Sequence, residues 1–250
     1  MERAKAQAER GAELYNQTRG QLTGYDCKEC LNRGDFMYIE LEHGVIYQRT
    51  RPCKCRNIRR NLQRLESSGL KNAEYQTFDS FEAAEDWQIR MKNIALDYAA
   101  HPEGWLFFGG QVGCGKTHLC TAVCARLIQQ GHNVLYVTWP DRVTRLKALV
   151  NDCAEYEKEL RRLKTAEILY LDDFFKPAQD AAPSAADIKL AYDLINYRYI
   201  NRMPTIISSE RSSIDLINID EATGTRIYDL SKRHGMTIMQ DGKRNYRMRQ

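Results

Sequence analysis

The feature that most constrains the fold of this chain is a glycine-rich segment that fits the pattern GxxxxGK[ST]. An apolar run at residues 105–108 precedes it, and an amphipathic, helix-favouring stretch at residues 118–130 follows it. A segment of this kind between a strand and a helix predicts a phosphate-binding loop in an α/β protein. A glycine-rich turn that matched this pattern by chance would rarely have a strand before it and a helix after it. The residues of the segment are Gly110, Gln111, Val112, Gly113, Cys114, Gly115, Lys116 and Thr117.

The residue types of this loop suit a nucleoside triphosphate. Glycines allow several backbone N–H groups to converge on phosphate oxygens, and the helix that begins near His118 presents its positive end to the anion. Lys116 is expected to reach the β- and γ-phosphates, and the Thr117 hydroxyl is expected to bind Mg²⁺. We therefore predict ATP and Mg²⁺ as ligands, with all the residues from Gly110 to His118 as nucleotide contacts and Cys114 at a variable position of the loop.

A second acidic motif follows downstream in the order that an ATPase requires. The apolar residues 168–171 are followed by Asp172 and Asp173, which is typical of a Walker B strand. Asp172 is predicted to orient Mg²⁺ or its water, and Asp173 to polarise the attacking water. Together with Lys116 they form the predicted catalytic set. The alternative is an acidic turn after an ordinary buried strand.

Alternation of apolar runs with helical segments predicts the fold class. A chain that alternates in this way forms a parallel sheet covered by helices. We predict a three-layer α/β core with a five-stranded parallel sheet at residues 70–250, preceded by a small module at residues 1–69. The expected strands of the core are residues 105–108, 134–139, 168–171, 205–208 and 236–239.

Four cysteines near the N-terminus have metal-ligand spacing. Cys27 and Cys30 precede two strand-like segments at residues 36–41 and 45–49, and Cys53 and Cys55 follow them. Two close pairs of thiolates can complete a tetrahedral structural Zn²⁺ site, which would stabilise a module with a small core. The last pair has one intervening residue instead of two, so an iron–sulfur cluster or a redox pair remains an alternative.

The apolar runs and the cysteines indicate in which cellular compartment the protein is found. No apolar run reaches the ~18 residues of a membrane helix, and the polar start lacks the hydrophobic segment of a secretory signal. We therefore expect a cytoplasmic protein without membrane contact, in which the eight cysteines are thiols or metal ligands. Residues 51–64 contain basic but no acidic residues. This pattern suits a nucleic-acid backbone, an acidic protein surface, or a solvated helix face.

Taken together, the motifs resemble the DnaC/DnaI replicative helicase loaders, especially those of phages and prophages. The resemblance also rests on residues 77–81 (TFDSF) and 204–209 (PTIISS), and it covers residues 25–250. It implies an AAA+ ATPase core without a C-terminal lid, ATP bound between self-associating subunits, and slow, partner-stimulated hydrolysis. The implied partners are a DnaB-type hexameric helicase, gripped by the N-terminal module, and single-stranded DNA. The compartment would be a bacterial cytoplasm.

The resemblance also assigns roles to individual residues. Arg226 matches the arginine finger that reaches a neighbouring subunit's nucleotide, and Ser208 and Ser209 match the sensor strand. Glu210 departs from the asparagine common in loaders, and it would repel phosphate unless it paired with a cation such as Arg211. The basic stretch at residues 141–152 corresponds to a helix that faces DNA, although a plain surface helix is an alternative reading. Its predicted DNA contacts are Arg142, Arg145 and Lys147.

Four functions fit these features to different degrees. The favoured one is an ATP-dependent loader of the replicative helicase. An IstB-like transposition helper shares the ATPase core but usually begins with a helical segment instead of a cysteine module. A small-molecule kinase needs the same loop, yet has no use for that module. A non-hydrolysing adaptor, in which ATP orders the fold, is disfavoured by the paired carboxylates.

Overall fold

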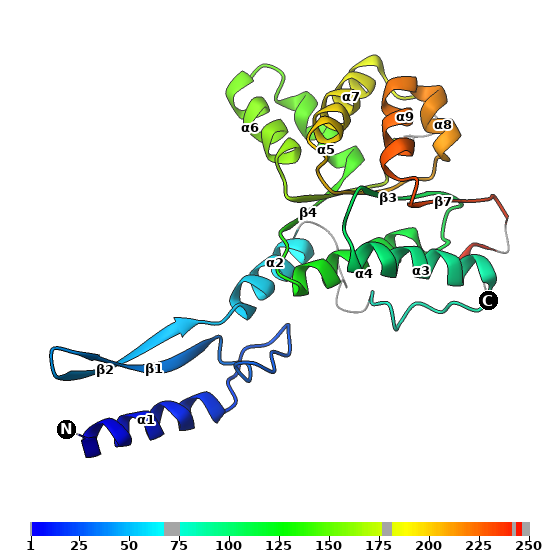
Figure 1. Cartoon of the computed structure of the whole chain (residues 1–250). Coiled ribbons are helices and arrows are strands. Elements are labelled where there is room, and N and C mark those ends of the chain that lie inside the picture. The colour runs from blue at the N-terminus through cyan, green and yellow to red at the C-terminus, as the bar shows by residue number, and fades with distance from the viewer. Residues whose placement is uncertain (1, 68–75, 177–181, 242–243, 247–250) are drawn as a thin grey trace. The chain divides into compact units, whose positions relative to one another are not determined.

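The computed structural model describes the whole chain except residues 1, 68–75, 177–181, 242–243 and 247–250. Two compact units are present, Met1–Arg64 and Leu65–Gln250. Both units appear in Figure 1. The predicted boundary between residues 69 and 70 lies outside the described residues.

The first unit is built around a β-hairpin, as predicted. Strand β1 (Asp35–Glu42) pairs antiparallel with β2 (Val45–Pro52), in a register that runs from Asp35 opposite Pro52 to Glu42 opposite Val45. The two-residue turn at His43 and Gly44 has positive φ at both positions, which is the geometry of tight hairpins. Helix α1 (Glu2–Gln17) precedes the hairpin, and α2 (Cys55–Ser67) follows it.

Hydrogen bonds hold α1 against the hairpin. The side chain of Asn16 both donates to and accepts from the backbone of Met37, at 2.9 Å in each case. Tyr15 donates to Asp35 at 2.8 Å, and its ring lies under the guanidinium of Arg33. These polar contacts matter because the first unit has a small apolar core, in which Tyr25 and Phe36 pack around the four cysteines.

The second unit contains the predicted five-stranded parallel sheet. The strand order is β4-β5-β6-β3-β7, so the strand that leads into the phosphate loop lies between β6 and β7. All six residues of that strand are buried. The bounds are β3 (Trp105–Gly110), β4 (Val134–Thr138), β5 (Ile168–Asp172), β6 (Thr205–Ser208) and β7 (His234–Ile238).

Helices cover both faces of this sheet (Figure 1). Helices α3 (Asp86–Ala100) and α4 (Lys116–Gln129) lie together on one face. The opposite face is covered by α5 (Trp139–Ala148), α6 (Cys153–Lys164), α7 (Ala185–Ile200), α8 (Ser213–Ile219) and α9 (Glu221–Leu230). Within the described residues, none of the helices has both the length and the apolar character that a bilayer crossing demands.

The sequence-based boundaries around α5 were wrong, and the last strand, predicted at residues 236–239, instead runs from His234 to Ile238. Trp139 was assigned to the end of a strand, but it begins α5, because Pro140 favours the first turn of a helix. The helix expected at residues 141–152 ends at Ala148, and Asp152 instead caps α6 by accepting from the Glu155 amide. Apolar residues continue at helical spacing from Val143 to Val150, beyond the end of α5, so periodicity alone did not reveal where the helix ends.

Candidate nucleotide site and cysteine cluster

The glycine-rich loop joins β3 to α4 and borders a cavity of about 510 Å³ in the second unit. Gly110 and Gly115 both have φ of +93°, a region that other residues adopt only with strain. A side chain at Gly115 would also approach Phe81 within 2.6 Å. Gly115 is the N-cap of α4, so the positive end of that helix faces the loop.

Lys116 and Thr117 start α4 and line the cavity. The ammonium of Lys116 donates to the carbonyls of Gly110 and Gln111, at 2.9 and 2.6 Å, which holds it over the loop. The Thr117 hydroxyl donates to Asp172 at 3.2 Å. The structure thus brings the predicted Mg²⁺ ligands Thr117 and Asp172 together from β5 and α4.

Hydroxyl groups surround the Asp172 carboxylate, which is 6% exposed. Besides Thr117, it accepts from Tyr136 at 3.2 Å, from Tyr170 at 2.9 Å and from Ser208. Burial, reinforced by the Asp172 charge, raises the pKa of both tyrosines, so they remain donors. A carboxylate oriented by neutral donors beside a threonine hydroxyl offers hard oxygen ligands, which fit Mg²⁺.

Asp173 follows directly, in the left-handed conformation with φ of +55°. Its carboxylate lines the cavity and accepts from Lys176 at 3.0 Å. Lys176 also pairs with Glu210 at 3.1 Å, so the cation beside Glu210 is Lys176 and not the suggested Arg211. Burial works against the charge of Lys176, but hydrogen bonds to Asp173 and Glu210 outweigh it and raise its pKa.

Of the remaining predicted nucleotide contacts, some line the cavity and others do not. Val112 and His118 line the cavity, as predicted for nucleotide contacts. The Gln111 side chain instead accepts from the Asp241 amide at 2.9 Å. Cys114 is fully buried, which raises the pKa of its thiol. Gly110, Gln111 and Cys114 are not among the described residues that line the cavity.

Aromatic groups that sequence reasoning did not select form another part of the cavity wall. The ring of Phe81 meets His118 edge-on, with centroids 5.4 Å apart, and His118 Nε2 lies 2.9 Å from the Thr77 carbonyl. From the C-terminal segment, Tyr246 donates its amide to the Gly113 carbonyl at 2.9 Å. No local motif marked Tyr246, because it follows the loop by more than a hundred residues.

Arg226 lies on α9 and does not line the cavity of its own chain. Its guanidinium donates to Asn196 at 3.0 Å and to the Ala222 carbonyl at 2.6 Å. It also lies over the rings of Tyr192 and Tyr199. These contacts fix the orientation of the guanidinium on a helix of the opposite face from α4.

The three predicted DNA contacts take part in ion pairs that connect helices. Arg142 and Arg145 of α5 both contact Glu159 of α6, at 2.5 and 3.1 Å. Lys147 contacts Asp187 of α7 at 2.5 Å. The side chain of Arg142 is 16% exposed, whereas those of Arg145 and Lys147 are 59% and 46% exposed. Arg142 therefore has the least surface to offer a phosphate.

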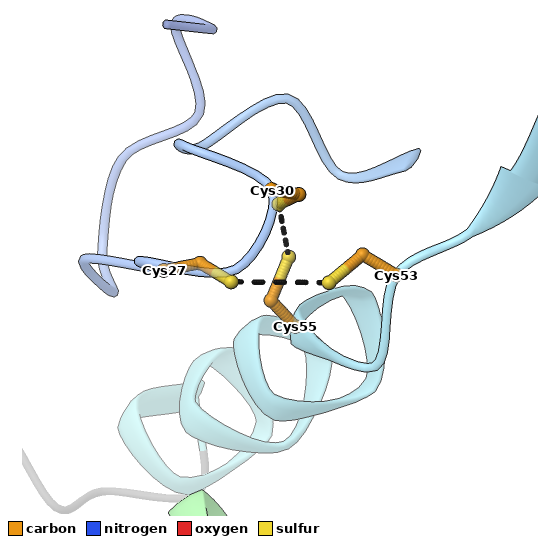
Figure 2. A group of neighbouring side chains, drawn as sticks. All are labelled: Cys27, Cys30, Cys53 and Cys55. Atoms are coloured by element: carbon orange, nitrogen blue, oxygen red, sulfur yellow. Dashed lines mark hydrogen bonds between the residues drawn. The ribbon is translucent and has the colours of Figure 1, made fainter. Parts of the chain in front are cut away.

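The four N-terminal cysteines form a buried cluster in the first unit (Figure 2). The Sγ atoms all lie within 4.8 Å of one another, with Cys27 to Cys53 at 3.8 Å and Cys30 to Cys55 at 3.5 Å. Thiolates around a tetrahedral zinc ion, with Zn–S distances of about 2.3 Å, are about 3.8 Å apart. None of the four forms a disulfide. The cluster thus fits a closed, structural zinc site.

Polar contacts around the cluster suit bound metal. The Gly34 amide donates to the Cys30 sulfur at 3.2 Å. Burial opposes ionisation of Cys30, but this bond and the neighbouring thiols outweigh it and lower its pKa to about 7. Asn32 accepts from the Cys27 amide at 2.7 Å and from Arg59 at 2.9 Å. Arg59, part of the basic run, is therefore buried beside the cluster instead of facing solvent.

Comparisons with known proteins agree with this architecture. The family model described as "IstB-like ATP binding protein" matches residues 41–250. The phage-like element PBSX protein XkdC of Bacillus subtilis (strain 168) is 33% identical over 219 residues, which cover 82% of this chain and 79% of XkdC. The insertion sequence IS21 putative ATP-binding protein of Pseudomonas aeruginosa is 24% identical over 198 residues, covering 78% of this chain and 71% of that protein.

A solved structure shows the same fold. The crystal structure of the DnaC helicase loader matches with a TM-score of 0.56 at 23% identity, and the match covers 68% of this chain and 99% of that chain. This likeness concerns the fold, whereas the sequence match over residues 41–250 defines the family. The chain belongs to the IstB-like ATP-binding protein family and has the AAA+ fold of DnaC.

Proposed function

We propose that this protein is an ATP-dependent loader that places a DnaB-type hexameric helicase on single-stranded DNA. The observation that carries the proposal is the combination, in one chain, of a nucleotide cavity and a separate cysteine module. The family match begins at residue 41, so Cys27 and Cys30 precede it. A metal-stabilised module added to an ATPase core suits a protein that must hold a partner while its nucleotide state changes.

The cavity residues divide the chemistry of ATP hydrolysis among them. Lys116 and the loop amides bind phosphate oxygens, while Thr117 and Asp172 would hold Mg²⁺, which would neutralise phosphate charge when bound. Asp173 accepts the proton of the attacking water. Its carboxylate lines the cavity and is 36% exposed, so water has access to it.

Self-association completes the site in this proposal. Arg226 lies outside its own cavity, yet four groups fix its orientation on α9, namely Asn196, the Ala222 carbonyl and two tyrosine rings. An arginine held in this way suits delivery to the nucleotide of a second copy, where it would stabilise the charge of the transferred phosphoryl group. Single-stranded DNA would contact the partly exposed Arg145 and Lys147.

An IstB-like transposition helper is the alternative. It is favoured by the family match and by the IS21 relative. The two functions differ in their DNA substrate and partner, because a helper would prefer duplex DNA and a transposase. The cysteine module favours the loader, since it gives the chain a second unit that can bind a helicase.

The deciding experiment is co-purification with the replicative helicase of the host, with and without ATP. We expect an ATP-dependent complex and faster helicase entry on single-stranded DNA. Lys116→Ala should lower loading about tenfold or more, because the ammonium contacts the phosphates. Lys158→Ala, at an exposed lysine that pairs with Glu155, is the matched control.

Two results would contradict the loader. One is the absence of any helicase complex in both nucleotide states. The other is tighter binding to duplex than to single-stranded DNA, together with ATP-dependent filament growth, which would favour the transposition helper.

A further inference from the structure

A second lysine reaches the nucleotide cavity beside Lys116. Lys176 follows β5 by four residues, and its ammonium lies 3.0 Å from Asp173 and 3.1 Å from Glu210. All three side chains line the cavity, and that of Lys176 is 41% exposed. The ion pair between Lys176 and Glu210 connects the segments that follow β5 and β6, which are neighbouring strands of the sheet.

The charges around the cavity show why this lysine matters. Four carboxylates line it, namely Glu82, Asp172, Asp173 and Glu210, and among the described lining residues the lysines are Lys116 and Lys176. Two of the carboxylates contact Lys176. A polyphosphate next to an uncompensated Glu210 would be repelled, because like charges at short range in a partly buried site are strongly unfavourable.

We propose that Lys176 binds the terminal phosphate of ATP and that it also neutralises Glu210, which would otherwise repel that phosphate. The proposal deepens the function proposed above and rests on it. An ammonium has three N–H donors, and two of them satisfy Asp173 and Glu210 in the structure. The third can meet a phosphate oxygen, because the flexible stem of a lysine lets its charge shift within the cavity.

This role has a specific consequence for nucleotide preference. ADP lacks the terminal phosphate, so Lys176 contributes to ATP affinity and not to ADP affinity. A structural ion pair that merely joins the segments after β5 and β6 would instead affect both nucleotides equally. The ratio of the two affinities therefore separates the roles.

The experiment is calorimetric titration of the full chain with Mg²⁺ and either ADP or a non-hydrolysable ATP analogue. Lys176→Met should weaken the analogue about tenfold and change ADP affinity less than about twofold, as expected for one charge-assisted phosphate contact. Lys158→Met is the matched control, because Lys158 also pairs with an acid three residues earlier. A thermal melt of each variant checks folding.

A double-mutant cycle tests the part played by Glu210. Glu210→Gln alone should retain ATP-analogue affinity, since Lys176 still contacts Asp173. Lys176→Met combined with Glu210→Gln should bind the analogue more tightly than Lys176→Met alone, because no uncompensated Glu210 remains. Coupling of this kind is the measure of a direct interaction.

The outcomes are distinguishable. An unchanged ratio of analogue to ADP affinity in Lys176→Met, with the wild-type chain binding both nucleotides, overturns the role of Lys176 alone. Equal losses of affinity for the ATP analogue and for ADP also overturn the role of Lys176. Failure of the wild-type chain to bind either nucleotide overturns the proposed function together with this inference.

Discussion

Single buried residues show how much of this structure depends on polar groups placed in the core. Arg198 of α7 is fully buried, and its guanidinium donates to the carbonyls of Leu163, Lys164, Ala166 and Pro204 and to the Thr205 hydroxyl. Burial lowers its pKa to about 10, so it stays charged at neutral pH. One arginine thereby joins α7 to the segments that lead into β5 and β6.

His234 at the start of β7 makes stability depend on pH. It is 1% exposed and contacts Asp97 at 3.0 Å. Burial lowers the pKa of His234 below 6.5, and the attraction of Asp97 offsets this only in part. A histidine whose pKa is lower in the folded state favours the neutral form there, so its contribution is complete above pH 6.5 and is lost as the pH falls further.

We therefore expect the melting temperature to decrease between about pH 7 and about pH 5, and to decrease less in His234→Asn. The measurement is thermal unfolding across this range in both proteins. The hydrogen bond from His234 lowers the pKa of Asp97, so Asp97 stays ionised throughout and does not contribute to the slope. Identical slopes in the two proteins would contradict the assignment.

At the scale of elements, the cysteine cluster is what holds the loop before β1, the end of β2 and the start of α2 together (Figure 2). Few apolar side chains pack with the cysteines, so bound metal should supply much of the folding free energy of the first unit. We expect about one zinc ion per chain by elemental analysis.

Cys30→Ser or a strong chelator should unfold the first unit and leave nucleotide binding by the second nearly unchanged. Far-UV circular dichroism and nucleotide titration together measure this. Cys153→Ser, at the exposed cysteine, is the control. Iron in the purified protein, with visible absorption, would replace the zinc assignment by an iron–sulfur cluster.

At the scale of the whole molecule, the proposed function requires a second copy to complete the site for hydrolysis. Lys116→Ala and Arg226→Ala should each lower ATP turnover, by about 10³-fold for loss of an arginine finger. A mixture of the two variants should recover part of the activity. The reason is that the intact cavity of the Arg226→Ala chain can receive the intact arginine of the Lys116→Ala chain. Turnover measured over a range of mixing ratios tests this.

Lack of recovery in the mixture, with both variants folded, would contradict action between subunits. Full activity of Arg226→Ala alone would show that the contacts with Asn196 and the tyrosines are purely structural.

The sequence alone was sufficient to recognise the parts of this protein whose functional groups are neighbours in the chain. The phosphate loop, the acidic end of β5 and the two cysteine pairs are contiguous motifs, and the alternation of apolar runs predicted the parallel sheet. In each case neighbouring residues in the chain carry both the conformation and the functional groups, so no long-range contact is needed to recognise them.

The tertiary structure alone decided which distant groups surround these motifs. Strand order places Ser208 beside Asp172 and brings Glu210 to Lys176, while helix packing pairs Arg142 with Glu159. Such contacts depend on which strands and helices become neighbours, and no local residue pattern specifies that. The sequence therefore identified the phosphate loop and its acids, whereas the environment that tunes them emerged only when the chain was folded.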